Sequence, residues 1–215
     1  MKRILVIAAH PDDEVLGCGG TIKKFVNSGF EVVTAIVAKG RPSEQRRINH
    51  FSKLANIQLG IKKVIFLNYA NLKLETYPLY KIVEKLACLI EAYEPEVVLT
   101  HYHGDINRDH QVTFEAVLTA TRPLPETKPV EILCFETVGS TEWGAHKSTF
   151  KPNFFVDITE TMEDKLKALR HYDVEMRPAP HPRSYEGVRL LAGVRGMTVG
   201  VQYGEAFEIV RRIWK

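Results

Sequence analysis

Two short segments of the chain concentrate side chains that can bind a metal ion. The first is HPDDE at residues 10–14, and the second runs from residue 101 to 110 with three histidines and two aspartates. Adjacent carboxylates repel one another unless a cation or hydrogen-bond donors compensate them. A divalent metal ion is the simplest compensation, so the two segments together predict a metal centre.

The residue types also predict which side chain does what at this centre. A catalytic zinc ion takes three protein ligands plus water and accepts imidazole nitrogen and carboxylate oxygen, which His10, Asp13 and His110 supply. Asp12 is expected to take a proton from the water as general base. Asp109 is expected to hydrogen-bond a ligand imidazole or the acid partner. Other divalent transition metals, such as iron or cobalt, suit the same ligands.

Simpler readings of these residues exist and are less favoured. Asp12 or Asp13 alone could cap a helix, but a second segment rich in His and Asp favours the metal. The GCGG stretch at 17–20 matches neither GxGxxG nor a P-loop, and we expect it to let the next helix pack close to the metal turn. Cys18 is expected to be a small buried residue. The chain has no GxSxG motif, so a serine nucleophile has no support.

The apolar pattern predicts the elements that position the two segments. Strands alternate with helices through residue 122, which favours an open, mainly parallel α/β sheet. Ligands of such sheets bind outside the carboxyl ends of the strands, where both segments fall. The expected strands are 3–9, 31–38, 64–67 and 96–100, and the expected helices are 21–28, 42–59 (from Pro42-Ser43), 79–93 and 109–120.

The remainder of the chain is expected to elaborate the same domain. We predict strands at 131–137 and 154–158, helices at 159–172 and 185–194, a loop at 177–183, and no assignment for 207–212. The prediction is one domain over 1–215, with a metal-binding core at 1–122 and a substrate-pocket elaboration at 123–215. Loops on a rigid scaffold commonly carry specificity.

Composition narrows the class of protein. The 215 residues carry a net charge of +3, and no basic run has interleaved aromatic residues, so nucleic acid is not an expected partner. Cys18, Cys88 and Cys134 form no CxxC pair, which favours a reducing compartment. The apolar run near the N-terminus is too short for a signal peptide, and no run approaches a membrane span. We therefore expect a cytoplasmic protein.

The motifs AHPDDEVLGCGGTI (residues 9–22) and HGDINRDHQVTFEA (residues 103–116) together resemble the PIG-L/LmbE family of zinc N-deacetylases. Segments at 135–143, 152–157 and 181–184 extend the similarity nearly end to end. The resemblance implies a Rossmann-like fold, one zinc ion on His10, Asp13 and His110, and Asp12 as general base. It further implies removal of the N-acetyl group from an N-acetylglucosamine-type amino sugar or its conjugate, and assembly into a homo-oligomer.

One departure from the family pattern concerns the proton for the leaving amine. Several relatives carry a histidine three positions before the last ligand, where this chain has Asn107. An amide donates a hydrogen bond to an oxyanion but delivers no proton at neutral pH. The acid role is then open among His101, His103, His181 and a protonated Asp12.

Substrate contacts are expected at four positions. The resemblance points to Arg47, or its neighbour Arg46, and to Asn71 on the sugar. The proline-rich loop adds His181 and Arg183, and the arginine would either pair with a phosphate or hydroxyls or only tie down its loop. Two rival functions remain: a metal-dependent hydrolase of another small conjugate, such as an amidase or phosphoesterase, and a non-catalytic nucleotide-binding module.

Overall fold

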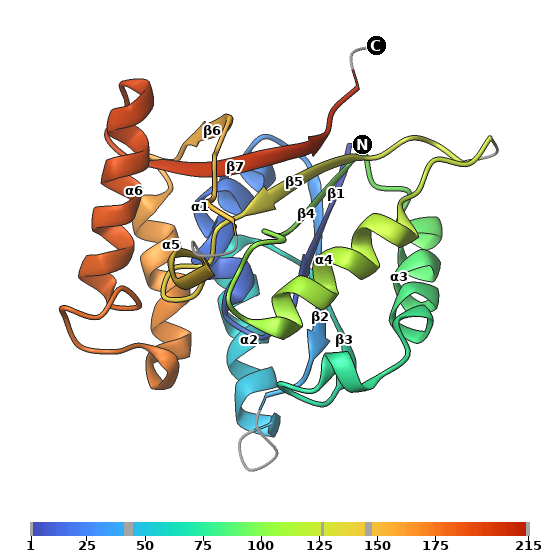
Figure 1. The fold of residues 1–215 in the computed structure, drawn as a ribbon. Helices are drawn as coiled ribbons and strands as arrows, with labels where there is room; N and C mark the ends of the chain where they lie inside the picture. The colour runs from blue at the N-terminus through green and yellow to red at the C-terminus, as the bar shows by residue number, and fades with distance from the viewer. Residues whose placement is uncertain (1, 41–44, 126, 145–147, 214–215) are drawn as a thin grey trace.

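One seven-stranded sheet organises the part of the chain that the structure describes. The structure is a computed structural model that describes residues 2–40, 45–125, 127–144 and 148–213. The strand order is β3-β2-β1-β4-β5-β7-β6, parallel through the first five and antiparallel at β7 and β6 (Figure 1). This confirms the predicted α/β class with a mainly parallel sheet. The strands are β1 (Arg3–Ala8), β2 (Glu31–Ala38), β3 (Lys63–Tyr69), β4 (Val97–His101), β5 (Glu131–Phe135), β6 (Phe154–Asp157) and β7 (Gly204–Arg211).

Helices cover both faces of the sheet, which explains why β1 is apolar from Ile4 onward. Its side chains alternate between two cores, with Ile4 and Val6 on one face and Leu5 and Ile7 on the other. Helices α1, α2, α5 and α6 pack on the first face, and α3 and α4 pack on the second (Figure 1). The α-helices are α1 (Asp13–Asn27), α2 (Gln45–Leu59), α3 (Leu79–Tyr93), α4 (Arg108–Ala120), α5 (Met162–Leu169) and α6 (Tyr185–Val199).

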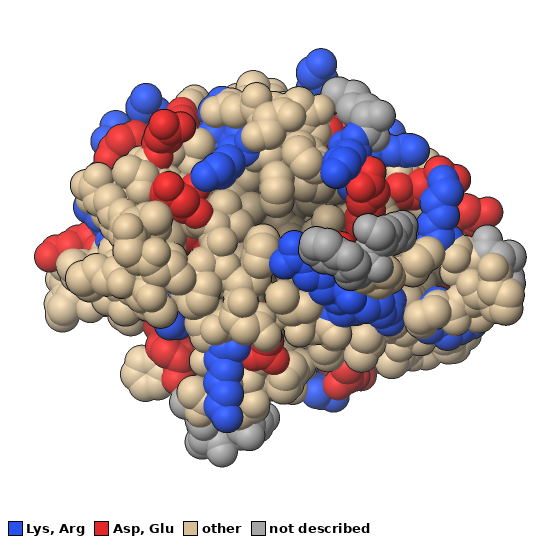
Figure 2. Space-filling view, turned by 90° about the horizontal axis from the view of Figure 1, so that it is seen from above, with Lys and Arg blue, Asp and Glu red and all other residues tan. Residues whose placement is uncertain are grey.

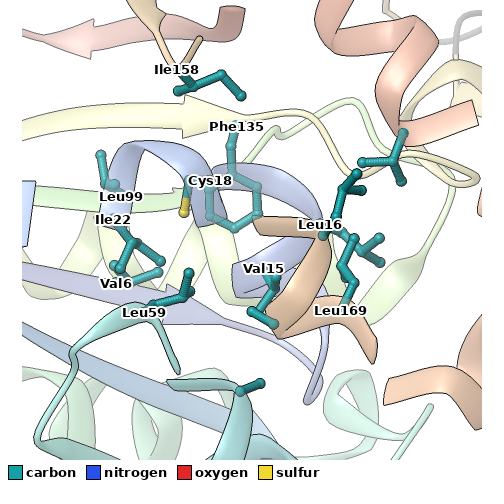
Figure 3. Close-up of a cluster of buried hydrophobic side chains, with 14 of the residues drawn as sticks. Val6, Val15, Leu16, Cys18, Ile22, Leu59, Leu99, Phe135, Ile158 and Leu169 are labelled. Atoms are coloured by element: carbon teal, nitrogen blue, oxygen red, sulfur yellow. The ribbon is translucent and has the colours of Figure 1, made fainter. Parts of the chain in front are cut away.

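Helix α1 begins eight residues earlier than the predicted 21–28, so the prediction of its start was wrong. The glycine-rich stretch lies inside the helix, which is broken at Cys18 (φ −146°). A side chain at position 17 would collide with the ring of Phe135. Figure 3 shows Phe135 reaching from β5 toward α1, next to Cys18. The glycines therefore permit a close approach, as expected, but between α1 itself and the sheet rather than between a following helix and the metal turn.

A buried ion pair closes the break in α1. Glu205 accepts hydrogen bonds from the backbone N–H groups of Gly20 (3.0 Å) and Thr21 (2.7 Å). Lys165 donates to the carbonyl of Leu16 (2.8 Å) and to Glu205 (2.6 Å). The pair thus satisfies backbone groups that a continuous helix would have paired internally.

Other boundaries differ from the sequence prediction in smaller ways. The helix expected at 159–172 is α5 followed by the 3₁₀ segment η3 (Arg170–Glu175). Helix α6 extends five residues past 194 to Val199, with Gly200 (φ 78°) as its C-cap residue, and the unassigned 207–212 falls largely in β7. The short 3₁₀ turns η1 (Leu74–Thr76) and η2 (Thr141–Gly144) were not predicted. The expected start of the second helix at Pro42-Ser43 lies outside the described residues.

Surface charge is mixed, as the near-balanced composition indicates. Basic and acidic side chains are interspersed over the face seen in Figure 2. Among the described residues, no helix combines the length and apolarity that crossing a bilayer requires.

Candidate metal centre

The two segments predicted to hold a metal meet at one edge of the sheet. Strands β1 and β4 are parallel neighbours, so their carboxyl ends lie together. His10 and Asp13 come from the turn after β1 and the start of α1, and His110 from the first turn of α4. The three side chains offer ligand atoms that all lie within 4.8 Å of one another. The predicted convergence of the two segments is therefore confirmed.

The candidate ligand atoms of His10, Asp13 and His110 lie close to one another. His10 Nδ1 and His110 Nε2 each lie 3.2 Å from Asp13 Oδ2. Among the described residues, neither nitrogen of the buried His110 ring has an aligned hydrogen-bond partner. Buried nitrogens of this kind are normally satisfied, and a cation between the three ligands would satisfy Nε2. Two imidazoles and one carboxylate are the donor set that zinc accepts.

The electrostatics of the site favour a positive charge at the three ligands. Burial alone would lower the pKa of His110, but the carboxylates of Asp13 and Asp105 raise it to about 10. Burial likewise opposes the ionisation of Asp13, yet His110, His10 and His101 hold its pKa well below its usual range. A proton or a metal ion can supply the charge that these carboxylates stabilise.

Asp109 contacts a ligand imidazole, as the sequence predicted. Its Oδ2 atom lies 3.0 Å from His10 Nε2 and accepts the Leu72 N–H (2.7 Å), while Oδ1 accepts the Leu74 N–H (2.9 Å). The backbone that follows β3 therefore fixes Asp109, and Asp109 in turn orients His10. Carboxylate partners of this kind set the tautomer and direction of metal-binding histidines.

Asp105 is the corresponding partner of His110, and sequence reasoning missed it. Its Oδ2 atom lies 3.2 Å from His110 Nδ1. The hydroxyls of Ser140 and Thr141 donate to its two oxygens, and these bonds together with His110 outweigh burial and lower the pKa of Asp105 to about 2. Its place in the 101–110 segment was the one sequence signal for such a role. Its partners Ser140 and Thr141 are distant in the sequence, so their contact with Asp105 could not be predicted.

Asp12 lies beside the three ligands in an uncommon backbone conformation. Its φ of 108° lies in a region that non-glycine residues rarely adopt, a sign of strain held by the surrounding structure. The side chain is buried, and its Oδ2 atom lies 3.2 Å from Arg183 Nη1. Burial raises the pKa of Asp12 to about 8, although Arg183 opposes the shift. A carboxyl group with a pKa in this range can exchange protons near neutral pH.

A pocket opens over these residues. Seven of the predicted site residues line it, namely His10, Asp12, Asp13, Asn71, Asn107, His110 and Arg183. Glu175, Ile48 and Leu72 also line it and were not predicted. Glu175 belongs to η3, and no local sequence motif predicted that this segment would contribute to the pocket.

Four predicted site residues lie outside this lining: Asp109, whose contact with His10 is described above, His101, Arg47 and His181. His101 is fully buried: its Nε2 accepts the Ala9 N–H (2.8 Å), and its ring stacks on His110 with centroids 3.9 Å apart. Burial holds the pKa of His101 well below its usual range. A neutral imidazole whose Nε2 already accepts from a backbone amide is poorly suited to proton transfer. This environment favours a role for His101 in packing against His110 and orienting its ring.

The other two lie near the protein surface. The guanidinium of Arg47 is exposed and sits over the Phe51 ring, 5.3 Å from its centroid. His181 is exposed, and its Nδ1 accepts the Arg183 N–H (3.0 Å). His103, an alternative for the acid role, lines a separate pocket with Glu208. Their predicted roles at the substrate stay predictions.

Asn107 begins α4 as its N-cap residue. Its Oδ1 atom accepts the Asp109 N–H (2.9 Å), which leaves the amide hydrogens as donors at the pocket. A helix cap is a rigid support, so the amide group is held in a fixed place.

Fold and site together define an α/β protein with a candidate metal centre at the carboxyl edge of its parallel strands. The chain belongs to the PIG-L family, described as GlcNAc-PI de-N-acetylase, whose model matches residues 5–121.

Relatives of known name cover most or all of the chain. Diacetylchitobiose deacetylase from Thermococcus kodakarensis is 28% identical over the whole chain and 85% of its own length. The structure of N,N'-diacetylchitobiose deacetylase from Pyrococcus horikoshii, complexed with an inhibitor, superposes with a TM-score of 0.79 at 27% identity, covering 97% of this chain and 84% of that one.

A second solved structure marks the limit of fold-based inference. GalB, a 4-carboxy-2-hydroxymuconate hydratase from Pseudomonas putida, has the same TM-score of 0.79 at 21% identity, covering all of this chain and 99% of its own. At that identity the likeness shows the fold alone, so the reaction must be argued from the site.

Proposed function

We propose that this chain is a zinc-dependent hydrolase that removes the N-acetyl group from an N-acetylglucosamine-type amino sugar or its conjugate and releases acetate. The observation that carries the proposal is the approach of His10, Asp13 and His110 within 4.8 Å, beside Asp12 and under an open pocket. The deacetylase relatives that match the full chain support the choice of an acetamide substrate.

The protein residues have distinct roles in the proposed reaction. His10, Asp13 and His110 would hold the ion, which when bound makes water more acidic and polarises a carbonyl. Asp12 takes the proton of the attacking water, and the amide hydrogens of Asn107 stabilise the negative charge that develops on the acetamide oxygen.

Departure of the amine requires a proton, and Asp12 is the group we assign to return it. Asn107 has no proton to give, and His101 is neutral with Nε2 committed to the Ala9 amide. The pKa of Asp12, raised to about 8 by burial, suits a group that first accepts and then donates a proton.

The pocket lining supports a polyhydroxylated substrate. Asn71, Glu175 and Arg183 offer amide, carboxylate and guanidinium groups above the metal ligands. Sugar hydroxyls both donate and accept hydrogen bonds, so this mixture of donors and acceptors suits them. Arg183 also lies 3.2 Å from Asp12, which supports a role for its guanidinium in binding the sugar beside the reacting group.

The first test is acetate release in the presence and absence of metal. The zinc-loaded protein is incubated with N-acetylglucosamine, N,N'-diacetylchitobiose and acidic conjugates of N-acetylglucosamine, and acetate is measured. We expect release from at least one sugar, loss after treatment with a chelator, and recovery with zinc. An amidase of another conjugate would release no acetate from any of the sugars, and a nucleotide-binding module would retain no tightly bound metal.

A further inference from the structure

Glu14 ends the HPDDE segment but lies behind the pocket rather than in its lining. It is fully buried, and its two carboxylate oxygens accept three hydrogen bonds. The donors are the backbone N–H of Asp12 (3.0 Å), Nδ2 of Asn56 (2.8 Å) and the hydroxyl of Tyr172 (2.7 Å). A buried carboxylate needs such donors. Glu14 therefore holds three segments to one another: the turn at residues 10–13 that carries Asp12 (the catalytic turn), α2 and η3.

The bond from Asp12 to Glu14 acts on the strained residue itself. A non-glycine residue at φ 108° is strained and persists only where the surroundings fix it. The Asp12 N–H is held by Glu14, and the Asp12 carbonyl accepts from the N–H groups of Val15 and Leu16. With both its N–H and its carbonyl bonded, Asp12 has little freedom to relax, and its side chain keeps its direction.

The partners of Glu14 are themselves fixed. Asn56 donates a second bond to the carbonyl of Ser52 (2.8 Å) and accepts one from Thr34 (2.8 Å), so its donors and its acceptor are in use. Tyr172 is fully buried in η3, the segment that carries the pocket residue Glu175. Glu14 therefore connects the catalytic turn to a wall of the pocket.

We propose that Glu14 is a positioning residue that holds the Asp12 carboxylate over the pocket through the Asp12 backbone, with Tyr172 and Asn56 orienting Glu14. The inference rests on the proposed role of Asp12 as general base. Catalytic groups must stay close to their productive geometry, and residues behind them supply that constraint.

The experiment uses the full-length, zinc-loaded protein with Glu14→Gln and Tyr172→Phe. A glutamine amide turns an acceptor into a donor, so at least one of the three bonds is lost. We expect Glu14→Gln to lower kcat about 10–100-fold, the range seen for groups behind a reacting residue, with KM within about twofold and zinc content unchanged. Tyr172→Phe removes one hydrogen bond and should lower kcat about 2–10-fold.

Tyr185→Phe is the matched control. The Tyr185 hydroxyl donates to Asp173 (2.8 Å), so it also holds η3 but does not contact Glu14. We expect its kcat to stay within about twofold of the wild-type value. An equal loss of kcat in Tyr185→Phe and Tyr172→Phe would assign the effect to η3 in general and overturn the proposal.

A double-mutant cycle separates this inference from the proposed function. If Glu14 acts through Asp12, adding Glu14→Gln to Asp12→Asn should cause no further loss of kcat. Losses of kcat that multiply in the double variant would overturn the positioning role, and so would a loss of bound zinc in proportion to activity. The role is also overturned if Glu14→Gln and Tyr172→Phe keep the wild-type kcat while Asp12→Asn loses activity. Wild-type activity in Asp12→Asn would instead refute the base role itself. Should Glu14→Gln fail to fold, Tyr172→Phe carries the same test.

Discussion

At the scale of the residue, each candidate ligand imidazole has a carboxylate behind it, Asp109 for His10 and Asp105 for His110. We predict that Asp105→Asn lowers zinc affinity about 10–100-fold, because the amide keeps only one acceptor oxygen for Ser140 and Thr141 and no longer offers His110 a negative charge. Competition with a chromogenic chelator measures the affinity.

The control is Asp157→Asn, which changes an exposed carboxylate that also accepts two hydrogen bonds, both from Thr159. Its zinc affinity should equal that of the wild type. Unchanged affinity in Asp105→Asn would show that His110 keeps its orientation without this charge.

At the scale of the element, α1 must pass close to β6 and α5 to place its first turn at the metal centre. A methyl group at position 20 would lie 2.8 Å from Ile158 Cβ, whereas one at position 193 in α6 would meet nothing within 4 Å. We predict that Gly20→Ala destabilises the fold by about 1–3 kcal/mol through overpacking. Gly193→Ala should stabilise it by about 0.5–1 kcal/mol, because glycine is costly within a helix. Urea denaturation measures both, and equal stabilities would contradict the packing argument.

At the scale of the whole molecule, the centre joins two strand ends, α1 and α4, so an ion that binds only the folded chain should stabilise all of it. At a hundredfold excess over Kd, zinc should add about 2.7 kcal/mol, which corresponds to a rise in Tm of about 5–10 °C for a domain of this size. His110→Ala should show little rise. Differential scanning calorimetry with and without zinc measures the shift, and an equal rise in the variant would argue against this centre.

The stabilisation by zinc is also expected to depend on pH, because His110 binds either a proton or the ion. Asp13 and Asp105 raise the pKa of His110 to about 10, so its bound proton stabilises the folded chain fully below the unfolded value near 6.5. That contribution is lost as the pH rises toward 10. Zinc must displace this proton, so the zinc-induced rise in Tm should be larger at pH 8 than at pH 6. A shift independent of pH would contradict this competition.

The sequence alone predicted the mainly parallel sheet, the strands that carry the candidate site and the three candidate metal ligands. Buried parallel strands are apolar runs of the local chain, and their carboxyl ends share one edge, so His10, Asp13 and His110 were predictable before any coordinates. Asn107 and Arg183 were likewise found from motif and loop, and both line the pocket.

Only the tertiary structure decided which of these residues meet and how. Asp105 and Asp109 look equivalent in the sequence, yet they contact different histidines, because η2 and η1 bring different donors to each. The bonds from Ala9 to His101, from Arg183 to Asp12 and from Tyr172 to Glu14 join residues 92 to 171 positions apart. Local periodicity carries no information on such pairs, since they form only where packed elements bring distant side chains together.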